Sequence, residues 1–144
     1  MLFTRAVPAA AAEPFYLGSW KFTGAVVAPW ADPAQKPDVK ERARLLGKRL
    51  VIAAKAIAGP DPFPCKGPHY AVKDYTADLL FQGAFDEMRS KNSSVDPAKI
   101  AASLGFAGPR VKTLETGCEF DFHFVDDTTV EIGLNDYVYT LKKQ

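Results

Sequence analysis

The sequence has little of several residue types that mark common functional classes. Only two cysteines and two histidines occur among its 144 residues, and 18 basic and 17 acidic side chains leave a formal net charge of +1. So few sulfur and imidazole ligands form no paired Cys/His signature of a zinc site. The balanced charge gives no electrostatic reason to bind nucleic acid. We therefore expect no metal, no cofactor and no nucleic-acid partner.

Short catalytic motifs and long apolar runs are also missing. There is no Gly-x-Ser-x-Gly elbow for a nucleophile and no His-Glu-x-x-His metal motif. Gly59 and Gly67 stand among prolines rather than before a helix, which is unlike a phosphate-binding loop. Since no apolar run reaches the roughly 18 residues that a membrane-spanning helix needs, no membrane span is expected. Binding is therefore a better prediction than catalysis.

Aromatic side chains, by contrast, are plentiful. The sequence contains ten Phe, five Tyr and two Trp, and hydrophobic residues make up 47% of it. Halves of a chain of this length would be too small to build good separate cores. We therefore expect one β-rich domain over residues 13–144.

Two features point to export. Residues 1–12 end in an alanine run that satisfies the small-x-small rule of signal-peptidase sites, so they are either the remnant of a signal peptide or a disordered leader. Cys65 and Cys118 both stand beside turn residues, which favours a disulfide between them, with two free buried thiols as the alternative. A disulfide is typical of oxidising compartments. We therefore expect a periplasmic or secreted protein.

The first half of the chain reads as strands and a helix separated by proline-rich loops. Residues 18–27 alternate apolar and polar side chains as a half-buried strand does. Asp38 is the expected N-cap of a short helix that stops at Gly47. Residues 48–58 read as a second strand, with a continuation of the helix as the alternative. The prolines of residues 59–65 predict an extended loop.

The second half predicts two helices and a strand meander. A short strand over 67–75 precedes a helix that Thr76 caps and that runs to about Arg89. Asp96 and Pro97 open another helix, which Gly105 ends. Strand-like runs follow at 110–116, 118–125, 128–134 and 137–141, and short polar pairs at 126–127 and 135–136 are typical of tight hairpins. The expected fold is β-rich α+β: an antiparallel meander or barrel-like sheet of six or seven strands with two or three short helices.

The run from Cys118 to Val125 carries the most pointed side-chain pattern. Strand alternation would place Glu119, Asp121 and His123 on one face, opposite a row of phenylalanines. The preferred interpretation is a solvated polar face over an aromatic core. The alternatives are a row of metal ligands, or an acid–base pair of Asp121 and His123.

A short motif suggests a family. Gly18-Ser19-Trp20 resembles the Gly-x-Trp that begins the first strand of lipocalin-like (calycin) barrels. This resemblance implies that Trp20 closes one end of a barrel and that the lumen holds a small apolar ligand. It transfers no catalytic residue.

Two kinds of binding therefore compete as functions. In the first, a barrel lumen holds a small hydrophobic molecule. The candidate ligand-binding residues are Trp20, Phe22, Trp30, Tyr70 and Phe122. In the second, the protein is a periplasmic inhibitor or immunity protein that docks a protein partner through a loop surface around Trp30, Phe63 and His69.

Overall fold

The structure, a computed structural model, describes residues 13–144. The predicted leader, residues 1–12, lies outside the described residues. In chain order the elements are β1 (Gly18–Val27), α1 (Val39–Leu45), β2 (Arg49–Ile52), β3 (Ala56–Ala58), β4 (Cys65–Lys66), β5 (Ala71–Tyr75), the 3-10 turn η1 (Ala77–Leu79), α2 (Leu80–Lys91), α3 (Pro97–Ser103), β6 (Val111–Glu115), β7 (Phe122–Asp126), β8 (Thr129–Leu134) and β9 (Tyr137–Lys143).

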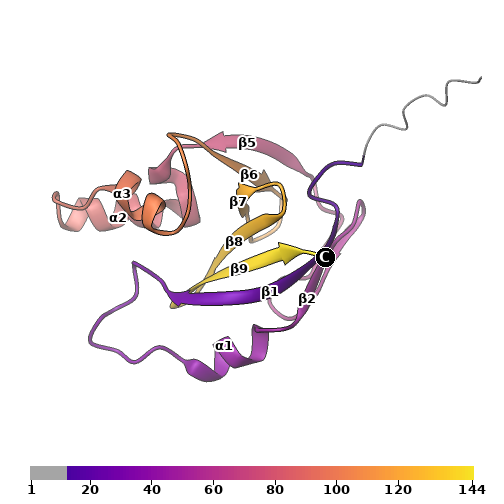
Figure 1. The fold of residues 1–144 in the computed structure, drawn as a ribbon, viewed down its shortest axis with the longest axis horizontal. Helices are drawn as coiled ribbons and strands as arrows, with labels where there is room; N and C mark the ends of the chain where they lie inside the picture. The colour runs from indigo at the N-terminus through magenta and orange to yellow at the C-terminus, as the bar shows by residue number, and fades with distance from the viewer. Residues whose placement is uncertain (1–12) are drawn as a thin grey trace, which may run out of the picture.

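These nine strands form one antiparallel sheet in the order β4-β3-β2-β1-β9-β8-β7-β6-β5. The sheet curls into a half-barrel, with α2 and α3 together on one side and α1 beside β1 and β2 (Figure 1). The β-rich antiparallel architecture and the three α-helices confirm the predicted class. The strand count of six or seven was too low.

The elements that were predicted correctly are those that depend on residues close together in sequence, such as helix caps and strand alternation. The first strand has the expected bounds, and its Trp20 and Phe22 point into the curl, where they are fully buried. The carboxylate of Asp38 accepts hydrogen bonds from the first backbone N–H groups of α1, and Asp96 caps α3 in the same way. Each of these signals involves neighbours in sequence, so it acts whatever the tertiary fold.

The predicted strand over residues 48–58 is two strands, which accounts for part of the higher count. Leu50 and Ile52 point inward from β2, whereas the next inward side chain is Ile57. That change from even to odd positions breaks the period of two, so a turn must intervene. The Ala53 N–H donates to the carbonyl of Ala56, and β3 returns antiparallel to β2.

The disulfide prediction is confirmed, and its place in the fold explains its use. Cys65 lies on β4, one edge of the sheet, and Cys118 lies in the connection between β6 and β7, near the opposite edge. Their Cα atoms are 6.1 Å apart across a sequence separation of 53 residues. The bond therefore links the two margins of the open curl. A loop of this length gives about 4 kcal/mol in the chain-entropy model.

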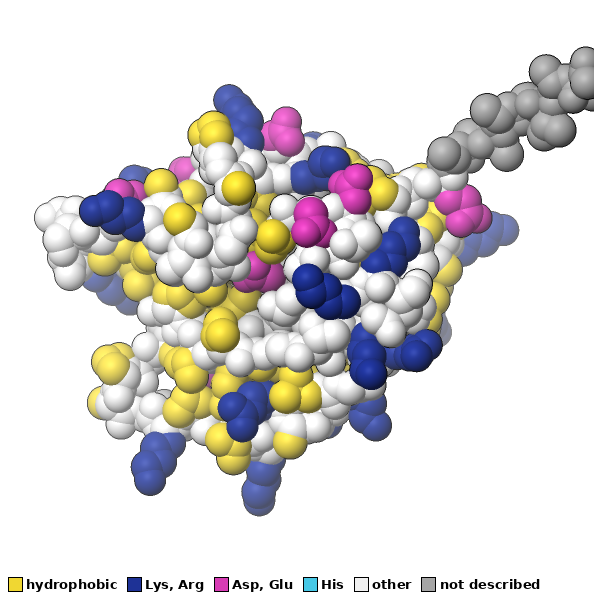
Figure 2. Space-filling model, viewed as in Figure 1, with side chains coloured by type: hydrophobic (Ala, Val, Ile, Leu, Met, Phe, Trp, Pro, Cys, Tyr) yellow, Lys and Arg dark blue, Asp and Glu magenta, His cyan; other side chains and the backbone are white. Residues whose placement is uncertain are grey.

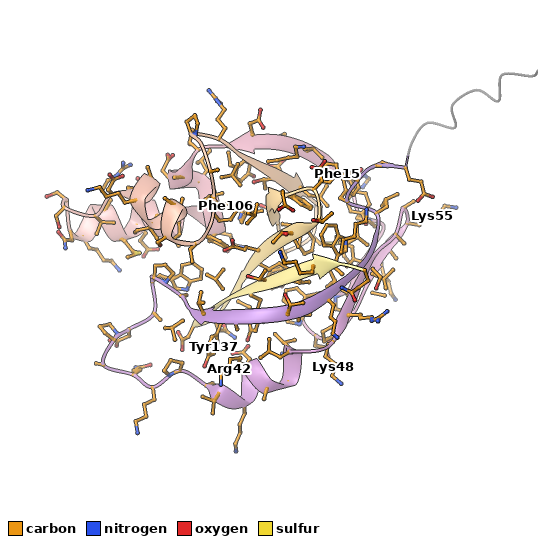
Figure 3. The ribbon with its side chains drawn as sticks, viewed as in Figure 1. Phe15, Arg42, Lys48, Lys55, Phe106 and Tyr137 are labelled. Carbon is orange, nitrogen blue, oxygen red and sulfur yellow. A yellow bond between two sulfur atoms is a disulfide. The ribbon has the colours of Figure 1, made fainter. Side chains whose placement is uncertain are left out.

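The sheet buries side chains on both faces. The inner core fills the concave side, and its largest members are Trp20, Tyr137, Tyr139, Phe22 and Phe122. A second core lies between the convex side and the two helices α2 and α3, with Phe106 pointing into the space between them and the sheet (Figure 3). We call it the helix-side core. A strand that is buried on both faces does not alternate apolar and polar side chains, and that alternation was the pattern used to predict the strands from the sequence.

The strand predicted over 118–125 begins only at Phe122. A side-chain-bonded turn occupies the residues before it: the Cys118 N–H donates to the Thr116 hydroxyl at 3.1 Å, and that hydroxyl donates to the Phe120 carbonyl at 2.8 Å. Gly117 has a φ of +75°, which favours glycine. Glu119 and Asp121 therefore lie outside the hydrogen-bonded ladder, on an irregular segment.

Candidate functional site

A cleft of about 310 Å³ opens beside the helix-side core. Three segments far apart in sequence supply its walls: the loop after β1, the start of α2, and the segment that leads into β7, with the β8–β9 turn closing one end. Figure 2 shows hydrophobic side chains along the border between the helices and the sheet. The lining residues are Trp30, Phe81, Gln82, Ala84, Glu119, Phe120, Asp121, His123, Gly133, Leu134 and Asn135.

Trp30 forms one wall of the cleft, where a hydrogen bond fixes its indole ring and a glycine on β8 leaves room for it. Its indole N–H donates to the Asn135 carbonyl at 2.8 Å, and its ring packs 5.3 Å from the ring of Phe81 between centroids. A Cβ added at Gly133 would lie 2.8 Å from the indole ring, closer than real Cβ contacts allow. Only glycine at position 133 therefore lets the ring lie against β8.

His123 is buried and fully hydrogen-bonded, so the predicted solvated face is wrong at this position. The residue is only 2% exposed, because the ring of Phe81, at the start of α2, and the ring of Tyr75 on β5 pack against it. Its Nε2 accepts the backbone N–H of Phe81 at 3.0 Å, and its Nδ1 lies 2.9 Å from the Thr113 hydroxyl. Burial lowers the pKa of His123 to about 3. The ring is therefore neutral at physiological pH, with the proton on Nδ1.

The engagement of both ring nitrogens limits what His123 can do. Nδ1 donates to the Thr113 hydroxyl, which in turn donates to the Val111 carbonyl at 3.3 Å. With Nε2 held by a backbone N–H, neither nitrogen has a free lone pair for a metal ion or for proton transfer. His123 is a positioning residue that fixes the backbone at the start of α2.

The backbone that His123 holds is unusual. The helix predicted from Thr76 to Arg89 is interrupted, and Phe81, Gln82 and Gly83 all adopt left-handed conformations, with φ of 51°, 58° and 75°. A non-glycine residue in this region costs roughly 1–2 kcal/mol. The turn directs Phe81 into the helix-side core, and the Gln82 amide donates to the Glu119 carbonyl at 3.0 Å, which ties α2 to the opposite wall.

The acidic wall of the cleft carries an uncompensated charge. Glu119 is exposed and Asp121 is half-buried, and neither is in an ion pair within residues 13–144. Burial, and then the charge of Glu115, raises the pKa of Asp121, and a hydrogen bond from the Thr116 backbone offsets only part of this rise. Glu115 itself is balanced, because Lys73 lies 2.9 Å away and the Tyr75 hydroxyl donates to it.

Four of the predicted site residues line the cleft, and the others lie elsewhere in the fold. Trp30, Glu119, Asp121 and His123 all line it. The remaining ligand candidates lie in or beside the inner core: Trp20, Phe22 and Phe122 are at most 1% exposed, and the half-buried Tyr70 donates its hydroxyl to the Ala53 carbonyl.

The residues of the alternative docking surface lie in different environments. Phe63 is only 3% exposed and packs between the rings of Phe22 and Phe120 in the inner core. His69 is exposed, with its backbone N–H bonded to the Thr116 carbonyl. Trp30 belongs to the cleft on the convex side. Phe63 therefore offers little area to a protein partner.

Several cleft residues were not predicted from the sequence, among them Phe81, Gln82 and Asn135. One signal was available: an isolated glycine inside a strand pattern, here Gly133, often marks close approach of another group. Nothing in the sequence marked Glu131, a buried acid on β8 directly opposite His123 in the cross-strand register.

No three His, Cys, Asp or Glu side chains come together as a metal site within residues 13–144. In the same part of the chain, no helix is long and apolar enough to cross a membrane. No protein-family model, no curated protein and no solved structure matches this chain.

Proposed function

We propose that this protein is a non-catalytic binding domain that holds a small organic molecule in the cleft between Trp30 and the segment 119–121. The volume of about 310 Å³ carries the proposal, because small-molecule sites occupy roughly 300–1,000 Å³ and are lined by aromatic groups with a few polar ones. Trp30, Phe81 and Phe120 supply the aromatic part, and Gln82 and Asn135 supply neutral polar groups.

This proposal moves the ligand from the predicted barrel lumen to the convex side of the sheet. Trp20 and Phe22 fill the concave side at 0% and 1% exposure, so a ligand there would have to displace core side chains. The cleft instead is already open to solvent. A lipocalin-like lumen stays a prediction from the Gly-x-Trp motif.

The non-catalytic part of the proposal rests on the state of His123 and Asp121, the acid–base pair that the sequence suggested. Both nitrogens of His123 hold protein groups, so the ring cannot exchange protons with a ligand without breaking the support of the turn at Phe81. Asp121 then has no imidazole partner for general acid–base work.

We also propose that the domain acts in the periplasm or outside the cell. The Cys65–Cys118 disulfide supports this compartment, because such bonds persist in oxidising environments and are rare in the cytosol. Alkylation of unreduced protein taken directly from its host tests the proposal. Two reactive thiols would contradict it.

A cleft-filling variant tests the binding site. Ala84 lines the cleft on α2, and Ala84→Leu adds bulk there without weakening the helix. Ala98→Leu on the exposed surface of α3 is the matched control. A thermal-shift screen of small molecules on the wild type, followed by calorimetry, should find ligands that bind the Ala98→Leu protein and lose affinity for Ala84→Leu. Ligands that bind both variants equally would place the site elsewhere.

A further inference from the structure

The ionised groups that line the cleft are all of one sign. Among its lining residues only Glu119 and Asp121 carry charge, since His123 is neutral and no lysine or arginine contributes to the lining. Figure 2 shows Lys and Arg side chains spread over the visible face, several of them over α1 at the bottom of the view. The cleft therefore presents two acids and no basic group to a ligand.

Of the two acids that line the cleft, Asp121 is the more desolvated. Its carboxylate is half-buried and lies within the field of Glu115, and the cation that balances Glu115 is Lys73. A carboxylate removed from water without a counter-charge is destabilised, and an opposite charge within a few ångströms relieves it. A positive ligand group beside Asp121 would supply that charge.

The aromatic side chains of the cleft favour an organic cation over a bare ion. Trp30, Phe81 and Phe120 contribute aromatic rings to the same space, and a cation is attracted to such a ring within roughly 6 Å of its centroid. The described residues form no cluster of three metal-type ligands. A space of about 310 Å³ has room for an ammonium group together with an apolar body.

We propose that the ligand of this cleft is a small organic cation, a protonated or quaternary amine on an aromatic or aliphatic body. The ammonium group lies against Asp121 and Glu119, and the body packs against Trp30 and Phe81. This inference rests on the proposed function, because it names the ligand class of the same cleft.

Matched probes separate charge from shape. Tryptamine is cationic at pH 7, tryptophol has nearly the same shape without the charge, and indole-3-acetate is an anion. Phenethylamine, phenethyl alcohol and benzyltrimethylammonium repeat the comparison on a smaller ring. Calorimetry on the full chain at low ionic strength should show each cation binding roughly tenfold or more tightly than its neutral analogue, with no binding of the anion.

Variants then assign the effect to residues. Asp121→Asn and Glu119→Gln should each weaken the amines by several-fold and leave the alcohols unchanged. Glu87→Gln is the control: it removes an exposed carboxylate of α2 that pairs with Lys91 at 3.5 Å and does not line the cleft. Glu119 is exposed, so its variant is safe for folding even if Asp121→Asn is not.

The outcomes distinguish the two proposals. Alcohols that bind as tightly as amines, with affinities unaffected by Asp121→Asn and Glu119→Gln but reduced by Ala84→Leu, would overturn the cation inference and leave the binding site standing. If no probe binds and the wider screen finds no ligand sensitive to Ala84→Leu, both proposals are wrong.

Discussion

Glu131 is a buried acid whose removal should stabilise the protein. It lies on β8, opposite His123 on one side and Thr140 on the other, and it is 3% exposed. Its Oε2 lies near Gly105, which ends α3: a Cβ at that glycine would be 3.9 Å away. The neighbouring His123 is neutral and so offers no counter-charge. Burial alone raises the pKa of Glu131 to about 8, from an ordinary value of 4.5.

The direction of the pH dependence follows from these two values. The unfolded chain releases the Glu131 proton at a lower pH than the folded protein does. Glu131 therefore costs no stability below about pH 4.5, and the free energy of unfolding falls as the pH rises towards 8. At roughly 1.4 kcal/mol for each pH unit above 4.5, the loss is about 3 kcal/mol at pH 7. A glutamine in the same place keeps the shape and cannot ionise.

Urea unfolding of the wild type and of Glu131→Gln, at several values between pH 4.5 and 8.5 with the disulfide intact, measures the difference. The two proteins should have nearly equal free energies of unfolding at the lowest pH, and the variant should be more stable by about 3 kcal/mol at pH 7. His123 also contributes to pH dependence, since its pKa is lowered on folding, but it is present in both proteins and cancels from the difference.

Glu87→Gln, at an exposed site on α2, is the control and should not change the pH dependence. A Glu131→Gln protein that is no more stable than the wild type at pH 8 would refute the reasoning. It would mean that water or a cation reaches this carboxylate in the folded protein.

Three further predictions concern the cleft and the disulfide. His123→Ala removes the acceptor of a buried N–H and should lower the free energy of unfolding by about 2–4 kcal/mol in urea titrations; an unchanged value would restore the solvated-face interpretation. Gly133→Ala should displace Trp30, lower stability by about 1–3 kcal/mol and alter tryptophan fluorescence, whereas an unchanged spectrum would contradict the contact. The double variant Cys65→Ser, Cys118→Ser should have a free energy of unfolding about 4 kcal/mol lower than the oxidised wild type, the same decrease as on reduction of the wild type. A double variant as stable as the oxidised protein would contradict the stabilising role of the disulfide.

The elements that the sequence predicted correctly depend on local chemistry. The first strand, the caps at Asp38 and Asp96, and the C-terminal hairpins each follow from residues within a few positions of one another. The disulfide was predictable for a different reason: two cysteines allow only one intramolecular pairing. The strand, the caps and the hairpins would be expected of this chain whatever surrounded them, whereas the disulfide also needed the fold to bring the two Cα atoms to 6.1 Å from each other.

Tertiary structure alone decided what covers the convex side of the sheet. Alternation along a strand shows that two faces differ, but it does not show whether water or a helix lies on the polar one. Here the Phe81 turn at the start of α2 packs on His123, which became a buried support rather than part of a solvated row, and Glu131, whose carboxylate lies beside Gly105 after α3, became a desolvated acid. Both results depend on packing between elements.

The cleft is likewise a product of the fold. Trp30, Phe81, Asp121 and Gly133 come from four separate parts of the chain, and the curl of the sheet and the left-handed turn at the start of α2 bring them together. The sequence by itself determined which residues were aromatic or acidic, because that is composition. Only the folded chain decided which of them share one space, because contacts between distant segments depend on the register and curvature of the whole sheet.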